Sequence, residues 1–235
     1  MIVTFEGIDG SGKTTLIKDV AKILGQKPGI DGQPITTVIS KAPSWGSDSL
    51  RQVEVNQLPP VQAAAEYIRD MRDMQQAWER WVKPGMVVLQ DRWSESTVVY
   101  QAMVASLDED KINTDAVIDG ASQLAFPSLT VYLQCPSNLA QQRIINRDGA
   151  GRWCEDRLKI IGKAYDLLYD VDVEHTMTSM QRTTATEYQY KVMQGIYGQD
   201  VIVIPSREDD NQAKRAGVVA ALIEQKLWGQ NAVHN

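Results

Sequence analysis

The chain has 235 residues and a mass of 26.2 kDa, which suits one large domain or two small ones. Hydrophobic residues make up 43% and charged residues 23%, which excludes disordered and collagen-like chains, and no apolar run reaches the ~18 residues of a membrane helix. The formal net charge of −6 argues against a duplex nucleic-acid binder, although a local cationic site for a small anion is compatible with it.

The residues that mark cellular location and reactivity are few. The N-terminus lacks the basic and long apolar segments of a signal peptide. Cys135 and Cys154 form neither a disulfide framework nor a zinc pattern, so we expect a reducing, cytoplasmic location. The only histidines are His175 and His234, which argues against chemistry built on a histidine base.

Apolar runs alternate with amphipathic stretches along the chain. The runs predict buried strands at residues 2–5, 36–39, 86–89, 129–133 and 201–204. The stretches between them predict helices at residues 13–24, 61–82, 116–124, 157–169 and 209–227. This alternation predicts an α/β fold of three layers, α/β/α, around a five-stranded parallel sheet. We expect a single domain over residues 1–235, with an insertion of uncertain structure at about 170–200.

A glycine-rich segment follows the first expected strand and opens the first expected helix. Residues 7–14 read G-I-D-G-S-G-K-T and match the phosphate-loop pattern G-x-x-x-x-G-K-[ST] at every fixed position. Its backbone N–H groups and the helix N-terminus would bind the phosphates of ATP. Lys13 is expected to reach the β- and γ-phosphates and Thr14 to ligate Mg²⁺. The expected ATP-binding residues are Gly7, Asp9, Gly10, Ser11, Gly12, Lys13, Thr14 and Thr15.

An acidic and a basic residue follow the third expected strand. Asp91 would lie beside the phosphate loop, since ligands bind at the carboxyl ends of parallel strands, and it would hold Mg²⁺. Arg92 presents a planar fork suited to a phosphate. The chain lacks the N-K-x-D motif of GTPases and is short for a motor, so we expect phosphoryl transfer to a second, anionic substrate.

Together these motifs resemble the thymidylate kinase family. The segments that carry the resemblance read F-E-G-I-D-G-S-G-K-T-T at residues 5–15, D-R-W at 91–93, S-T at 96–97, Y-Q at 100–101 and P-S-L-T-V-Y-L at 127–133. It covers residues 1 to about 169 and, more loosely, 201–227. It implies a P-loop kinase fold, ATP and Mg²⁺ as cofactors, no nucleic-acid polymer or membrane as partner, and a homodimer.

The resemblance also implies roles for the residues that bind the acceptor nucleotide. Asp9 would accept a hydrogen bond from the deoxyribose 3′-hydroxyl, Arg92 would bind the acceptor phosphate, and Tyr100 would pack against C2′ and disfavour a ribose. Ser96 and Thr97 could touch the base. On the helix at 61–82, Tyr67, or Ile68 in another register, would stack on the base, and Arg72, with Arg69 second, would read its edge.

A loop with two glycines between two arginines is expected at residues 143–153, in a lid that spans about 143–157. Arg147 and Arg152 are the candidates to stabilise the transferred phosphoryl group, with Arg143 and Arg157 behind them. Some members of the family carry an arginine directly after the phosphate-loop aspartate; this chain has Gly10 there and resembles those that depend on lid arginines.

One family segment is altered in this chain. The family's R-E-P segment appears as residues 41–43, K-A-P, so that Lys41 keeps the positive charge while Ala42 replaces the acid. The expected reaction is transfer of the γ-phosphoryl group of ATP to dTMP, giving dTDP, with Lys13, Arg92, Arg147, Arg152 and Asp9 as the catalytic set. The alternatives are a broader deoxynucleoside-monophosphate kinase, a deoxynucleoside kinase, and an ATP-binding switch protein without an acceptor.

Overall fold

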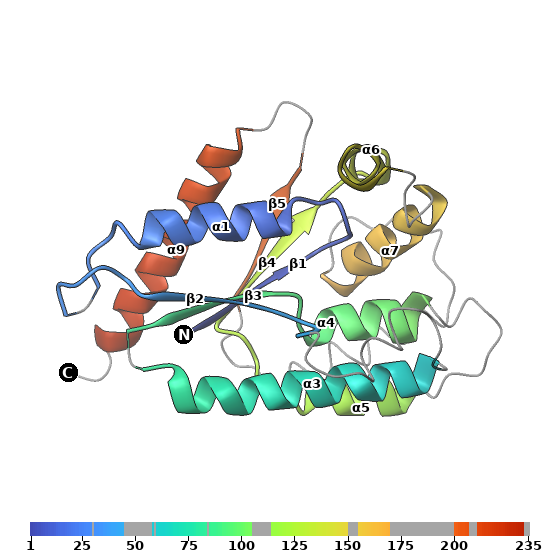
Figure 1. Cartoon of the computed structure of the whole chain (residues 1–235), viewed down its shortest axis with the longest axis horizontal. Helices are drawn as coiled ribbons and strands as arrows, with labels where there is room; N and C mark the ends of the chain where they lie inside the picture. Colours follow the sequence, from blue (N-terminus) through green and yellow to red (C-terminus); the bar gives the residue numbers. More distant parts are fainter. Residues whose placement is uncertain are drawn as a thin grey trace.

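The fold is a parallel sheet with helices on both faces (Figure 1). The computed structural model of the chain describes residues 1–29, 31–44, 58, 60–83, 85–104, 114–149, 155–169, 200–206 and 211–232. Its strands are β1 (Ile2–Glu6), β2 (Thr37–Lys41), β3 (Val87–Asp91), β4 (Leu129–Gln134) and β5 (Asp200–Pro205). Its helices are α1 (Lys13–Leu24), α3 (Pro60–Trp81), α4 (Ser94–Thr97), the π-helix η1 (Val98–Val104), α5 (Thr114–Ser122), α6 (Ser137–Asp148), α7 (Glu155–Leu168) and α9 (Gln212–Ala232).

The strands lie in the order β2-β3-β1-β4-β5, and every neighbouring pair is parallel. The predicted five-stranded parallel sheet is therefore confirmed. Because β1 lies between β3 and β4, the loop after β1 meets the ends of both neighbours at the carboxyl edge, where open α/β sheets bind ligands. Phe5 is in register with Asp91, which brings the segment after β3 next to the phosphate loop.

Alternate residues along the strands contact opposite helix layers. On one face, Val3 and Phe5 of β1 share a buried cluster with the apolar stripes of α1 and α9. On the other face, the α3 residues Ile68, Met71 and Trp78 pack against β3 and the loop that follows it, at the spacing of an amphipathic helix. A third cluster joins η1, α5, α6 and α7 to Tyr132 of β4. Burial on both faces explains why the strands read as continuous apolar runs.

Two segments differ from the prediction. Residues 143–148, expected as loop, form the end of helix α6, so that part of the loop prediction is wrong. Leu139, Ala140 and Ile144 are buried along this helix, and their contacts stabilise a segment that is otherwise polar. Helices α4 and η1 are not predicted by the sequence pattern, since S-E-S-T-V-V-Y carries no helical stripe. The expected insertion at about 170–200 lies outside the described residues, apart from Asp200. No described helix has the length and apolar character needed to cross a membrane.

Candidate active site

The phosphate loop joins β1 to α1 and closes around the side chain of Lys13. Lys13 is buried, and its Nζ donates to the backbone oxygens of Gly7 and Ile8 at 2.8 Å each and lies 3.4 Å from Ser11 Oγ. Burial, and next the neighbouring Arg92 cation, lower the pKa of Lys13 to about 8. The two backbone carbonyls are neutral acceptors for this ammonium group. A bound phosphate would give it an anionic partner.

Gly10 fits where no other residue would. Its φ is +81°, and a Cβ at this position would lie 2.3 Å from the backbone oxygen of Ala140 on α6. Helix α6 therefore fills the space that a side chain after Asp9 would need. Arg143 on the same helix reaches back to the loop, with its Nη1 3.4 Å from the Ser11 backbone oxygen. The structure thus explains why this position of the chain is small.

Thr14 and Asp91 meet at the edge of the sheet. Thr14 Oγ1 donates to Asp91 Oδ2 at 2.7 Å, and the threonine is exposed at the start of α1. Asp91 Oδ1 is buried and has no hydrogen-bond partner among the described residues. A hydroxyl beside a carboxylate with an unused oxygen fits Mg²⁺, which binds one or two protein groups together with substrate phosphates. The described residues contain no cluster of three or more His, Cys, Asp or Glu that could hold a metal by itself.

Arg92 points at the phosphate loop. Its Nη2 donates to Asp9 Oδ1 at 2.7 Å, and the two side chains are 13% and 40% exposed. Arg92 has a φ of +71°, the only positive φ at a non-glycine among the described residues. This conformation is uncommon outside glycine and, where the surroundings impose it, is associated with functional sites. The guanidinium of Arg92 and the carboxylate of Asp9 meet from the segments that follow β3 and β1.

Three hydroxyl groups surround the guanidinium of Arg92. Nη1 donates to Ser96 Oγ at 3.0 Å and to the Tyr165 hydroxyl at 3.2 Å, and Nη2 donates to the Tyr100 hydroxyl at 3.3 Å. The guanidinium carbon lies 5.1 Å from the centre of the Tyr100 ring, within range of a cation–π contact. Neutral hydroxyls hold the guanidinium without cancelling its charge, so an incoming anion would have to replace only the Asp9 carboxylate as the ion-pair partner.

The residues expected to contact the base are spread over a wider area. Tyr67 is half-buried against the α3 cluster, and Thr97 is buried in α4. Arg72 is exposed, and its Nη2 donates to Gln123 Oε1 at 2.6 Å. Lys41 is exposed at the end of β2. The roles of Tyr67, Arg72 and Lys41 stay predictions.

The lid candidates are described only in part. Arg147, in the last turn of α6, is exposed and forms an ion pair with the adjacent Asp148, with Nη2–Oδ2 at 2.5 Å. Arg157 is exposed in the first turn of α7. Arg152 lies outside the described residues. Arg143 contacts the phosphate loop directly, through the backbone oxygens of Gly10 and Ser11.

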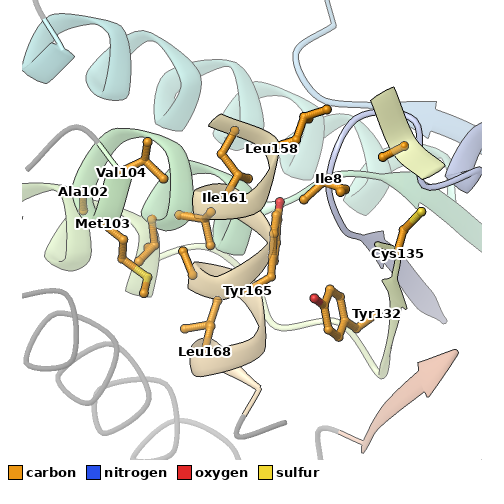
Figure 2. Close-up of a cluster of buried hydrophobic side chains, with 14 of the residues drawn as sticks. Ile8, Ala102, Met103, Val104, Tyr132, Cys135, Leu158, Ile161, Tyr165 and Leu168 are labelled. Carbon is orange, nitrogen blue, oxygen red and sulfur yellow. The ribbon is translucent and has the colours of Figure 1, made fainter. Parts of the chain in front are cut away.

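Two further residues at the site are not indicated as functional by the sequence motifs. Glu6, at the end of β1, is fully buried and accepts hydrogen bonds from the Trp93 backbone and the Ser96 hydroxyl. Tyr165 extends from α7 beside the Tyr132 ring, and the two ring centres are 5.7 Å apart (Figure 2). A glutamate at the end of an apolar strand is a usable signal for Glu6, because an acid in that position is buried only with partners. For Tyr165, the position in the expected helix at residues 157–169 indicates only a core residue.

Comparison with known proteins agrees with this geometry. A profile of the family described as thymidylate kinase matches residues 5–194. The chain belongs to the thymidylate kinase family. A thymidylate kinase of Geotalea uraniireducens is 31% identical over 175 residues, which cover 67% of this chain and 74% of the relative. Thymidylate kinases of Fervidobacterium nodosum and Thermosipho africanus are 27% and 24% identical over 169 and 152 residues, covering 70% and 63% of this chain and 79% and 73% of the relatives.

For a thymidylate kinase family member, the arrangement separates two candidate anion-binding regions. The phosphate loop with Lys13 and Thr14 forms one, and Arg92 forms the other, with Asp9 between them. The matched region includes every described residue of both regions. The family relation therefore accounts for a nucleotide-binding phosphotransferase built on this fold.

Proposed function

We propose that the protein transfers the γ-phosphoryl group of ATP to dTMP, giving dTDP and ADP. One observation carries the proposal: the Arg92 guanidinium lies 2.7 Å from Asp9 of the phosphate loop, so a cation for the acceptor phosphate adjoins the site for the donor phosphates. The family match and the names of the relatives support dTMP as the acceptor.

The reaction needs alignment and charge more than a general base. The acceptor phosphate is already an anionic nucleophile, and catalysis of phosphoryl transfer depends on in-line positioning and electrostatic stabilisation. Lys13 would hold the β- and γ-phosphate oxygens, and Arg92 would fix the acceptor phosphate for attack. When bound at Thr14 and Asp91, Mg²⁺ supplies further positive charge to the donor phosphates. Arg147 and Arg152 would complete the charge around the transferred group.

The sugar of the acceptor would lie between Asp9 and Tyr100. A carboxylate can only accept, and the 3′-hydroxyl donates, so Asp9 suits a nucleotide with a free 3′-hydroxyl. The Tyr100 ring, in contact with Arg92, would occupy the space that a 2′-hydroxyl needs. On the base, Tyr67 would stack and Arg72 would donate to a carbonyl, with Ser96 and Thr97 nearby. Lys41 would be a further, positively charged substrate-binding residue.

A coupled assay with ATP and Mg²⁺ tests this function. Each deoxynucleoside and ribonucleoside monophosphate is offered in turn, together with thymidine and a reaction without acceptor. We expect the highest kcat/KM for dTMP, with dTDP identified by chromatography. Faster phosphorylation of thymidine than of dTMP would favour a deoxynucleoside kinase. Similar rates with several monophosphates would favour a broader kinase. Slow ATP hydrolysis that no monophosphate accelerates would favour a switch protein. A Lys13→Ala variant controls for contaminating kinases.

The remaining expectations from the sequence also stay proposals. They comprise the homodimer, the cytoplasmic location, the use of ATP and Mg²⁺, the single domain, and the lid at about 143–157. Light scattering of the purified protein measures the mass in solution, and a value near 26 kDa instead of about twice that would contradict the dimer.

A further inference from the structure

A buried carboxylate lies beneath Arg92 at the end of β1. Glu6 has no exposed surface, and such a group is costly inside a protein unless it is hydrogen-bonded. Its Oε1 accepts from the Trp93 backbone N–H at 2.6 Å, and its Oε2 accepts from the Ser96 hydroxyl at 2.6 Å. The Tyr165 hydroxyl donates to the same Oε2 at 3.1 Å. The partners come from two segments far apart in the chain, residues 93–96 and helix α7.

The partners of Glu6 are also the partners of Arg92. Ser96 Oγ and the Tyr165 hydroxyl, which both contact Glu6 Oε2, accept hydrogen bonds from Arg92 Nη1 at 3.0 and 3.2 Å. Trp93, whose N–H contacts Glu6 Oε1, is the residue directly after Arg92. The bond to Trp93 therefore anchors the turn in which Arg92 adopts its φ of +71°. Glu6 is thus linked to the side chain of Arg92 through Ser96 and Tyr165, and to the backbone next to Arg92 through Trp93.

The direction of these hydrogen bonds matters for Arg92. A serine hydroxyl has one proton to donate and two lone pairs that accept. When Ser96 donates its proton to Glu6, its lone pairs are left for the guanidinium, which can only donate. Without an acceptor at Glu6, the Ser96 proton can turn to the Tyr165 hydroxyl, 2.6 Å away, which has itself lost its acceptor, so the orientation of both hydroxyls toward Arg92 is no longer fixed.

We propose that Glu6 is a positioning residue that holds Arg92 toward the acceptor phosphate through Ser96, Tyr165 and the Trp93 backbone. This inference rests on the proposed role of Arg92 in binding the acceptor. Glu6 itself touches neither nucleotide, because it is fully buried.

Two variants of Glu6 and one matched control test the inference. Glu6→Met keeps the length of the side chain but removes the acceptor oxygens, and Glu6→Gln keeps one of them. Glu95 is the control: it is a buried acid on the neighbouring α4, and its Oε2 accepts from the hydroxyl of Ser94. At pH 9, where Glu6 is ionised with or without the charge of Glu95, we expect Glu6→Met to raise the KM for dTMP about tenfold or more with the KM for ATP within twofold, and Glu95→Met to leave both within twofold.

The pH profile of the Glu6→Gln variant gives a second measurement if Glu6→Met does not fold. Burial, and next the charge of Glu95, raise the pKa of Glu6 to about 8. Below that pH Glu6 is protonated and neutral, like the glutamine side chain of the variant. Above that pH the Glu6 carboxylate is ionised, and the glutamine is not. We therefore expect the dTMP KM of Glu6→Gln to match that of the wild type at pH 6.5 and to exceed it at pH 9. The charged and titratable groups that face Glu6 are Arg92 after β3, Glu95 on α4, Lys13 on α1, Tyr100 on η1 and Tyr165 on α7.

Three results would overturn the inference. They are a folded Glu6→Met protein with an unchanged KM for dTMP, an equal rise in both KM values, and an equal effect of Glu95→Met. If Glu6→Met is unfolded, the same ratio of Glu6→Gln to wild-type KM at both pH values would overturn it. A wild-type protein that phosphorylates no monophosphate would instead overturn the proposed function, before any variant is compared.

Discussion

Replacing Arg92 by alanine removes the cation that we place against the acceptor phosphate. The guanidinium is only 13% exposed and is held by Asp9, Ser96, Tyr100 and Tyr165, so an incoming phosphate meets a largely desolvated and oriented donor. Two charge-assisted hydrogen bonds of about 2 kcal/mol each amount to about 4 kcal/mol. This corresponds to a loss of roughly a thousandfold in kcat/KM for dTMP.

Steady-state kinetics at varied dTMP and at varied ATP, with ATP binding measured by calorimetry, check this prediction. ATP should bind Arg92→Ala within about threefold of the wild type, because the bonds from Lys13 to the Gly7 and Ile8 backbone oxygens do not involve Arg92. Arg80→Ala, at an exposed arginine on α3, is the matched control and should be unchanged. A loss below tenfold in kcat/KM for dTMP, in a folded protein, would refute the role of Arg92 as the acceptor cation.

Three more predictions follow from residues of the same site. Gly10→Ala should lower the free energy of unfolding by about 1–3 kcal/mol, because its Cβ would lie 2.3 Å from the Ala140 backbone oxygen at a φ of +81°. Thermal unfolding measures this loss. An unchanged melting temperature would contradict the close approach of the phosphate loop to α6. The kcat/KM for ATP should fall as the pH rises through about 8, because Lys13 then loses its proton; a profile that stays flat to pH 9.5 would count against a cationic role in the free enzyme. Tyr100→Ala should narrow the preference for dTMP over UMP by about tenfold or more, since the ring would no longer occupy the space of a 2′-hydroxyl; competition between the two substrates measures the ratio, and an unchanged ratio would assign the discrimination to another residue.

The layers of the fold could be predicted from the sequence because buried parallel strands are apolar on both faces. Each of the five expected strands overlaps an observed one, and the order β2-β3-β1-β4-β5 adds the one feature that hydrophobic patterns do not contain. Helix α6 could not be predicted because most of its residues are polar and its second half carries two arginines near two glycines. Its structure depends on tertiary contacts, such as Ala140 against Gly10, that a local pattern does not record.

The site divides in the same way. The phosphate loop and the Asp91–Arg92 pair were predictable because their spacing is local and β1 and β3 are the strands that precede them. The Thr14–Asp91 contact follows from the register of those strands. The support of Arg92 by Glu6 and Tyr165 was not predictable, since it joins residues 159 positions apart through side-chain hydroxyl groups. Arg72 is exposed and donates to Gln123, the residue directly after α5, and its expected role in reading the base stays a prediction.

The ion pair between Asp9 and Arg92 has a consequence for how the enzyme would choose among small anions in the cell. While the two side chains are paired, an isolated orthophosphate that bound Arg92 would have to replace the Asp9 carboxylate, which accepts from the guanidinium at 2.7 Å. A nucleotide brings both halves of the exchange at once, an anion for the arginine and a hydroxyl for the aspartate. The ion pair would thus lower the affinity of the free enzyme for inorganic anions. It would favour a molecule that carries a phosphate and a sugar hydroxyl at the separation of Arg92 and Asp9.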